Sequence, residues 1–577
     1  MRNKFAALSL AALLLAGCQE GKGEPRPEAT AEIPIATPET TTVDKPAVAE
    51  ETGDELTRFD KLEAELEQIR EILKIPGMSA GVVKNQELVW AEGFGFADLA
   101  NEVPATADTP YHLASVTKPI AAALIMQLVE EGDLDLERPV SDFGVELESE
   151  GVINSWHLLT HTSAGVPGSV HNYDGSRYGY LEEVVEGVTG SSFRDLLDER
   201  ILSPLGMEDT APNLILCPMG DDDEASNRRE ADYLCVHEAM AKPYQLDLAY
   251  NVVDGEYQTI FSPAAGLIST VNDLARFDIA LDQNELMKQE TKEAMFEPLV
   301  STYGDSDELK YGLGWYNQLF DGTNLVWHSG RWPPSISALY LKVPEEDLTF
   351  IVLANTPNLT TPFPLGYGDV MYSALAVAFY KHIVFPQLYG SDAPEIDWEM
   401  DQEELAVFLD QIEDGHARSL LQRELLARRM ALMSTGRFAE GYDMLMANNR
   451  AFGPAEGLGL YDDTAAMPAP EGTRVELSTA ELERLVGKYI LSEKPSFLGP
   501  GEVPEEISIG LVGEILVACS DLEDEGLVLT PIAPDRLRVL GGPEGYMTFD
   551  VIFDGQDIAA INANLTDAIA LTYVLEK

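Results

Sequence analysis

The sequence has few basic residues for its number of acidic ones. Its 577 residues include 38 Lys and Arg against 99 Asp and Glu, which leaves a formal net charge of −61 at pH 7. Proteins bind nucleic acids and anionic lipid head groups mainly through cationic side chains. The deficit therefore excludes nucleic-acid binding and argues against electrostatic docking on an anionic membrane. An acidic excess also keeps proteins soluble at high ionic strength, which fits a saline habitat.

Long apolar runs are missing as well. The N-terminal run at residues 5–16 is shorter than the ~20 residues that a membrane-spanning helix needs. It follows Arg2 and Lys4 and ends in small residues, which is typical of a cleavable secretory signal. No other segment is apolar enough to cross a membrane.

The end of this run, residues 15–18 (LAGC), resembles the lipobox of bacterial lipoproteins. The resemblance implies cleavage before Cys18 and acylation of that residue, whose several chains would anchor the protein durably. Gln19 in the next position favours the outer membrane over the inner one. We therefore expect a lipid-anchored protein of the cell envelope, with its body in the periplasm or outside and no other contact with a membrane. The alternative is an ordinary secretory signal with an incidental cysteine.

Cysteine is scarce, with four residues in the whole chain. In an oxidising compartment Cys217 and Cys235 can form a disulfide, which would close a short loop worth about 3 kcal/mol in the chain-entropy model. That loop holds an acidic turn at residues 221–224, but its spacing lacks the glycine and the terminal glutamate of a calcium-binding loop. We interpret it as a solvated turn, and Cys519 as a buried strand residue.

Composition and periodicity divide the chain into five stretches. After the signal (1–18), residues 19–56 are rich in Pro, Thr, Glu and Ala and predict a disordered tether. Residues 57–390 combine a helix at 59–73, a hairpin around Asn85-Gln86, a helical middle and strands at 312–320, 325–327, 336–343 and 349–353. Strands at both ends predict an α+β fold whose sheet joins the two ends. Residues 391–475 predict a helical connector, and residues 476–577 predict an antiparallel β-barrel-like domain with a turn at Asp554-Gly555.

One Ser-x-x-Lys motif, from Ser115 to Lys118, opens an apolar run that predicts a helix up to Gly132. Residues three apart share a helix face, so the hydroxyl and the amine can meet. A lysine buried beside a serine has a lowered pKa and can take the serine's proton, which makes the hydroxyl a nucleophile. By itself the motif is weak, and the alternative is a capped helix start with a surface lysine.

Further motifs follow at 157–163 (HLLTHTS), 188–190 (VTG), 204–210 (PLGMEDT), 263–270 (PAAGLIST), 273–277 (DLARF), 311–315 (YGLGW) and 327–330 (WHSG). In this order and at these distances they resemble the serine β-lactamase-related family, which includes class C β-lactamases, D-stereospecific peptidases and several esterases. The resemblance covers roughly residues 57 to 360. It implies a β-lactamase/DD-peptidase-like fold, with an antiparallel sheet flanked by helices and a helical subdomain. It also agrees with Ser115 as the nucleophile.

The family's Tyr-x-Asn triplet is absent, and the matching position reads Tyr173-Asp174-Gly175. The resemblance implies that Tyr173 is the second base, which helps to deprotonate Ser115 and protonates the leaving group. The alternatives are that Tyr173 is a core aromatic and that Tyr178, whose spacing favours a packing role, takes its place. Gly175 lacks the amide that contacts substrate in the family.

The family's Lys-Thr-Gly triplet reads His328-Ser329-Gly330, followed by Arg331. The resemblance implies that these four residues border the substrate, and that the backbone N–H groups of Ser115 and Arg331 form the oxyanion hole. The Arg331 side chain is expected either to clamp a substrate carboxylate or to lie over Trp332.

These residues predict a serine hydrolase that acts through an acyl-enzyme on ester or amide bonds of a small molecule or peptide, with no metal or organic cofactor. His328 and Gly175 favour an esterase or D-amino-acid peptidase over a β-lactamase. His157 and His161 lie four apart, but the glutamate of a zinc metalloprotease is missing between them, so we expect no metal there. The alternative function is a catalytically inactive lipoprotein of the same fold that binds peptidoglycan or peptides.

Overall fold

The computed structural model describes residues 53–452, apart from gaps at 214, 217–232, 248, 258, 305, 333–334 and 399, and most of residues 482–575 outside the connections between strands. The signal with Cys18, nearly all of the 19–56 stretch, Cys217 and the acidic turn at 221–224 lie outside the described residues. In the part that is described, no helix combines the length and apolar character needed to cross a membrane.

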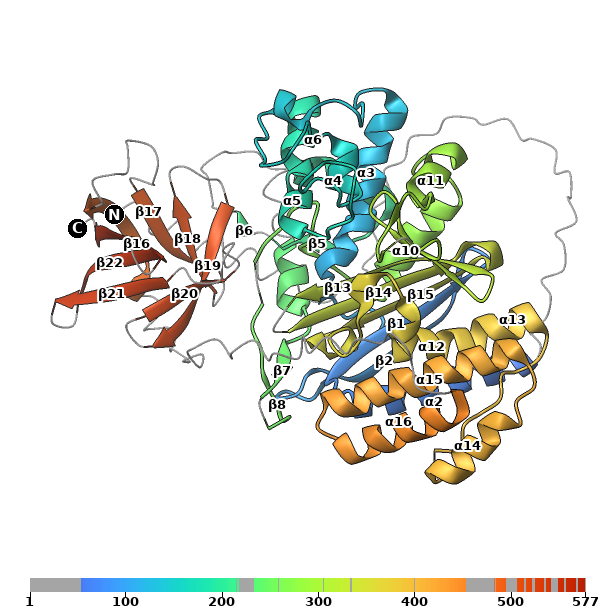
Figure 1. The fold of residues 1–577 in the computed structure, drawn as a ribbon. Coiled ribbons are helices and arrows are strands. Elements are labelled where there is room, and N and C mark those ends of the chain that lie inside the picture. Colours follow the sequence, from blue (N-terminus) through green and yellow to red (C-terminus); the bar gives the residue numbers. More distant parts are fainter. Residues whose placement is uncertain are drawn as a thin grey trace, which may run out of the picture.

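A nine-stranded antiparallel sheet lies at the centre of the larger part of the molecule (Figure 1). Its strand order is β10-β11-β12-β13-β14-β15-β1-β2-β3. Met78 of β1 pairs with Ala354 of β15, so the sheet joins the two ends of this part as predicted. The strands are β1 (Gly77–Lys84), β2 (Glu87–Asp98), β3 (Val103–Pro104), β10 (Val300–Ser301), β11 (Leu309–Tyr311), β12 (Tyr316–Phe320), β13 (Thr323–Trp332), β14 (Ile336–Val343) and β15 (Leu348–Ala354).

Side chains of the central strands alternate between two hydrophobic cores, one on each face of the sheet. In β14, Tyr340 packs into one core while Leu339 and Leu341 pack into the other. The core on the first face includes residues of the helices α3 (Thr117–Glu131), α6 (Leu181–Thr189), α10 (Val271–Asp282) and α11 (Gln289–Phe296). The second face is covered by α2 (Gly53–Ile72), α12 (Ala374–Phe379), η8 (Tyr380–Val384), α13 (Phe385–Tyr389) and α15 (Gly415–Ser434), which lie below the sheet in Figure 1.

Two helices of this second layer differ in detail from the sequence prediction. Helix α2 begins at Gly53, earlier than the predicted start at residue 59. Helix α15 comes from the stretch predicted as a connector, yet its Leu420 and Ala427 belong to the same core as the sheet. With α14 (Gln402–Asp410) and α16 (Phe438–Phe452) it also forms a small core of its own.

The local turns show where the strand predictions hold and where one fails. Asn85 and Gln86 have φ of 49° and 61° between paired strands, which confirms the predicted hairpin. The strand predicted at 312–320 is confirmed only for β12 at its C-terminal end, because residues 312–315 form a turn between β11 and β12. Gly314 has a φ of 82° there, and a Cβ at this position would lie 2.8 Å from that of Ala122 in α3. Glycine thus lets the turn pack directly on the helix.

The C-terminal residues form a closed antiparallel sheet, in which each strand pairs with the next and β16 also pairs with β23. This confirms the predicted barrel-like fold, and Asp554 opposite Asp557 confirms the predicted hairpin. Strand β6 (Ile215–Leu216), from the larger part, pairs with β19 of this sheet. The strands are β16 (Gly487–Glu493), β17 (Glu506–Val512), β18 (Ile515–Ser520), β19 (Glu525–Ala533), β20 (Arg536–Leu540), β21 (Thr548–Asp554), β22 (Asp557–Thr566) and β23 (Ile569–Leu575).

Candidate active site

Ser115 lies in a short 3-10 turn, η1 (Ala114–Val116), directly before α3. The preceding Ala114 has a φ of 47°, in the left-handed region that costs a non-glycine residue about 1–2 kcal/mol. Its N–H donates to Nδ1 of His112 at 2.9 Å. Burial lowers the pKa of His112 to about 3, so the ring is neutral, and because Nδ1 accepts this hydrogen bond the single ring proton is on Nε2. The turn is thus held in a strained form that leaves Ser115 half-buried at the start of a buried helix.

Lys118 lies one helical turn further on, fully buried, and meets Ser115 as the spacing predicts. Its Nζ lies 3.2 Å from Oγ of Ser115 and 2.8 Å from the carbonyl oxygen of Ala264. Burial lowers the pKa of Lys118 to about 7, against the opposing effect of the Asp174 carboxylate. A fraction of the amine is therefore neutral near pH 7 and can accept the serine proton. The role of Ala264 was not predicted, although its motif was recognised.

Tyr173 lies beside Lys118, whose Nζ is 4.9 Å from the centre of the phenol ring. The residue is 37% exposed, and its hydroxyl forms a hydrogen bond with Ser115. Partial burial raises the pKa of Tyr173, and the hydrogen bond with Ser115 opposes the rise only in part. The phenol therefore keeps its proton at neutral pH, and Lys118 is the group that can start the proton transfer. Tyr178 is fully buried and donates to the carbonyl oxygen of Lys118 at 3.5 Å, as a packing residue would.

His161 fixes the segment that carries Tyr173. The backbone N–H groups on either side of Tyr173 both donate to it: Asn172 to its carbonyl oxygen at 2.7 Å, and Asp174 to its Nδ1 at 3.1 Å. The two rings lie 4.2 Å apart. Burial holds the pKa of His161 well below its usual value, so the ring stays neutral and Nδ1 can accept. His157, its partner in the spacing, instead completes the capping box of helix α4 (Ser155–Leu159).

We expect His161→Phe to slow the reaction of Ser115 with a fluorophosphonate by roughly 10- to 100-fold, because small misplacements of a proton donor are costly. His161→Asn keeps an acceptor near the Asp174 N–H and tolerates the φ of 54°, so it should retain more of the rate. Thermal unfolding of both variants controls for folding. Equal losses in the two variants would show that this hydrogen bond does not matter.

Strand β13 brings the remaining predicted residues past the nucleophile's turn. A Cβ at Gly330 would lie 2.0 Å from the carbonyl oxygen of Leu113 and 3.3 Å from the Cβ of Ala114. Strand and turn are therefore in direct backbone contact, and the N–H groups of Ser115 and Arg331 belong to these two neighbouring segments. The Arg331 side chain is exposed, and Ser329 is half-buried.

Gly330→Ala is expected to force β13 away from η1 and to lower the rate by about 10²–10³-fold, the usual cost of losing one oxyanion donor. Gly366→Ala is a matched control, because a Cβ there meets nothing within 4 Å. Steady-state hydrolysis of an ester by both variants measures the effect. An unchanged rate in Gly330→Ala would contradict the assigned position of the oxyanion hole.

His328 lies in the same strand, β13, and is fully buried. Its Nδ1 lies 2.7 Å from the carbonyl oxygen of Ser329, which can only accept, so Nδ1 carries the proton. Its Nε2 then accepts from the hydroxyl of Tyr311 at 3.1 Å. Burial lowers the pKa of His328 to about 3, which keeps the ring neutral. Both nitrogens are engaged within the protein, so His328 presents no charge to a substrate.

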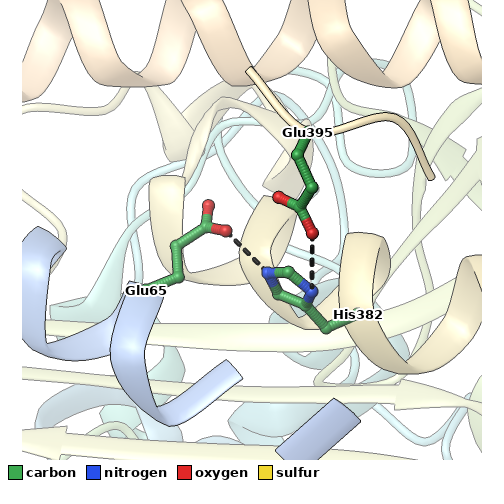
Figure 2. A group of neighbouring side chains, drawn as sticks. All are labelled: Glu65, His382 and Glu395. Atoms are coloured by element: carbon green, nitrogen blue, oxygen red, sulfur yellow. Dashed lines mark hydrogen bonds and ion pairs between the residues drawn. The ribbon is translucent and has the colours of Figure 1, made fainter. Parts of the chain in front are cut away.

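Within the described residues, one group has the composition of a metal site: Glu65, His382 and Glu395 (Figure 2). The two carboxylates contact opposite nitrogens of the imidazole, at 2.6 and 4.0 Å, whereas a metal ion would bind one nitrogen. The ammonium of Lys381 lies 3.1 Å from Glu65, 3.0 Å from Glu395 and 2.8 Å from Glu424. This cluster is an ion-pair network that joins α2, η8 and α15 on the face of the sheet opposite Ser115.

Of the two cysteines in the predicted disulfide, Cys235 lies among the described residues. Cys235 is disulfide-bonded. Cys217 lies outside the described residues, so its pairing with Cys235 stays a prediction.

The family model for beta-lactamase matches residues 62–368, more than half of the chain. The chain belongs to the beta-lactamase family. Penicillin-binding protein 4* of Bacillus subtilis (strain 168) is 26% identical to this beta-lactamase family member over 353 residues, which are 54% of this chain and 72% of that protein. Protein flp of Staphylococcus aureus (strain NCTC 8325 / PS 47) is 25% identical over 326 residues, covering 50% of this chain and 61% of that protein. The solved octameric penicillin-binding protein homologue from Pyrococcus abyssi has 19% identity and a TM-score of 0.47, covering 89% of this chain and 99% of that one.

The family predicted from the motifs, that of the β-lactamase-related serine hydrolases, is therefore confirmed. The match runs from α2 to the segment after β15 and contains Ser115, Lys118 and Tyr173. It ends before α14, and leaves α16 and the closed C-terminal sheet outside. The roles of the individual site residues stay predictions.

Proposed function

We propose that this protein is a serine hydrolase that cleaves ester or amide bonds through an acyl-enzyme on Ser115. The observation that carries the proposal is the buried amine of Lys118, 3.2 Å from Oγ of Ser115, with its pKa lowered to about 7. A surface lysine at the same sequence position would be fully protonated at neutral pH and could not take a proton. The buried one can.

In the proposed mechanism, Lys118 accepts the proton of Ser115 as Oγ attacks the carbonyl carbon of the substrate. The negative charge of the tetrahedral intermediate is stabilised by the N–H groups of Ser115 and Arg331. Tyr173 donates its proton to the departing alcohol or amine and is reprotonated by Lys118. A water molecule then attacks the acyl-enzyme with the same groups in reverse, releasing a carboxylic acid and restoring the serine.

The substrate that we propose is an ester or a D-amino-acid amide rather than a β-lactam. Where β-lactamases of the family usually keep a lysine, His328 is neutral and both its nitrogens are engaged, so it offers no charge to a substrate carboxylate. Gly175 likewise offers no side-chain amide. The exposed guanidinium of Arg331, on the strand that contacts the turn of Ser115, is then a cation that a substrate carboxylate could meet, so peptides remain possible substrates.

The proposed location is the cell envelope, with the lipid on Cys18 as the only membrane contact and the outer membrane favoured. The sequence of the first eighteen residues supports this part of the proposal.

A panel of p-nitrophenyl esters, D-amino-acid p-nitroanilides and a chromogenic β-lactam tests the activity. We expect esters or D-anilides to be hydrolysed faster than the β-lactam, and all activity to be lost in Ser115→Ala. The β-lactam arm is included because a relative is named a penicillin-binding protein. Preferred hydrolysis of the β-lactam would contradict the proposed substrate class. Binding of peptidoglycan fragments without any turnover would favour the non-catalytic alternative.

A further inference from the structure

A cavity of about 430 Å³ lies among α14, α15 and α16, outside the span of the family match. This volume falls within the ~300–1,000 Å³ of typical small-molecule sites. Its apolar lining consists of the buried Leu405 and Leu432 together with the half-buried Trp398, Met400 and Met444. Helix α15 packs on the second face of the sheet, whereas Ser115 and α3 lie on the first. The cavity is therefore separate from the candidate active site.

The cavity also contains a cation that no anion of the described residues binds directly. The guanidinium of Arg428 lies 4.0 Å from the centre of the Trp398 ring, over its face. Among the described residues it has no hydrogen bond and no ion pair. The buried carboxylate of Glu424, which interacts electrostatically with Arg428, accepts a hydrogen bond from Lys381 at 2.8 Å. Since arginine stays protonated in proteins, a planar double donor is presented to the cavity.

The rim of the cavity has the opposite charge. Glu403, Glu440 and Asp443 line it and are exposed, and Asp401 caps α14 through two backbone N–H groups. Glu440 also forms an ion pair with Arg437, so its charge is partly balanced within α16 and the turn before it. The lining thus combines a half-buried cation, exposed carboxylates and apolar side chains. A ligand that matches all three features carries a carboxylate, an apolar body and an ammonium group.

We propose that this cavity binds a free amino acid or short peptide with an apolar side chain, with its carboxylate on Arg428 and its ammonium toward the acidic rim. A bidentate guanidinium–carboxylate pair beside an aromatic ring is a strong and geometrically specific contact. The proposal does not rest on the proposed function, because none of its residues belongs to the hydrolase site. Hydrolysis of a peptide at Ser115 would nonetheless release a product of this same chemical class.

Titration calorimetry of the full-length protein tests the proposal, with leucine and leucyl-leucine as free acids and as C-terminal amides. The Ser115→Ala variant is used throughout, so that turnover cannot contribute heat and binding at the active site is tested apart from catalysis. We expect the free acids to bind at least about tenfold more tightly than the amides, because the amides lack the anion for Arg428. Equal affinity of acid and amide, or no binding of either, would overturn the proposal.

Two variants locate the binding. Arg428→Gln is expected to remove the preference for the free acid, while Arg428→Lys keeps the charge and should retain part of it. Arg331→Gln, at the candidate active site, should leave the preference unchanged. If Arg331→Gln abolishes it and Arg428→Gln does not, the ligand binds at the hydrolase site and the proposal is wrong. If Arg428→Gln does not fold, the comparison of acid and amide is made with Arg428→Lys, in which the preference for the free acid should be smaller than with Arg428. An undiminished preference in Arg428→Lys would then contradict the proposal.

Discussion

Ser115→Ala is expected to abolish hydrolysis of every ester and amide substrate, with a loss on the order of 10⁴- to 10⁶-fold. Without Oγ no acyl-enzyme can form, and the remaining rate would come from the oxyanion hole and binding alone. Because Ser115 is half-buried and its loss leaves no large cavity, thermal unfolding should change little. Steady-state kinetics with a p-nitrophenyl ester measures the effect.

The control for this prediction is Ser141→Ala, an exposed serine in η2 (Val140–Phe143), which should keep the full rate. Comparable activity of Ser115→Ala and Ser141→Ala would place the nucleophile elsewhere in the chain.

Lys118→Met is expected to lower the rate by about 10²–10⁴-fold, the usual contribution of a general base. Lys118→Arg should be as inactive, because a guanidinium keeps the positive charge but cannot give up its proton. Comparing these two variants distinguishes the two roles that a lysine can have beside a serine, namely proton transfer and a fixed positive charge. If Lys118→Arg were active and Lys118→Met inactive, the charge rather than the proton transfer would be what Ser115 needs.

The lowered pKa of Lys118 also predicts how rate and stability vary with pH. Below about pH 7 the amine is protonated and cannot accept, so the rate of acylation should rise with pH through this value. An unfolded lysine has a pKa near 10.5, so the unfolded state binds more protons between about pH 7 and 10.5. This group therefore makes the folded protein more stable as pH rises through that window, and Lys118→Met should remove that contribution. A rate that does not vary between pH 5 and 9 would contradict the assignment.

The parts of the site that the sequence could predict are those set by short spacing. Ser115 and Lys118 are one helical turn apart, so their contact follows from helix geometry. The hairpin at Asn85 is equally local. By contrast, Ala264 accepts from Lys118 across 146 positions, and nothing in the local pattern indicates which carbonyl group the fold brings there.

The unpredicted features share a common physical origin in tertiary packing. His161 was considered for zinc because of its spacing, but its position is defined by two backbone N–H groups of a segment that comes later in the chain. The strand predicted at 312–320 breaks at Gly314, where close contact with α3 overrides the β-propensity of the flanking residues. The charge network of Lys381 joins three elements that the sequence separates widely.

The central claim is that Lys118 activates Ser115 as a nucleophile, and one measurement tests it most directly. The purified protein is treated with a fluorophosphonate, and the modified peptide is located by mass spectrometry beside the Ser115→Ala and Lys118→Met variants. We predict a single adduct on Ser115 that is absent in the first variant and forms far more slowly in the second. An adduct on another serine, or none on Ser115 in a folded protein that the probe can reach, would contradict the account.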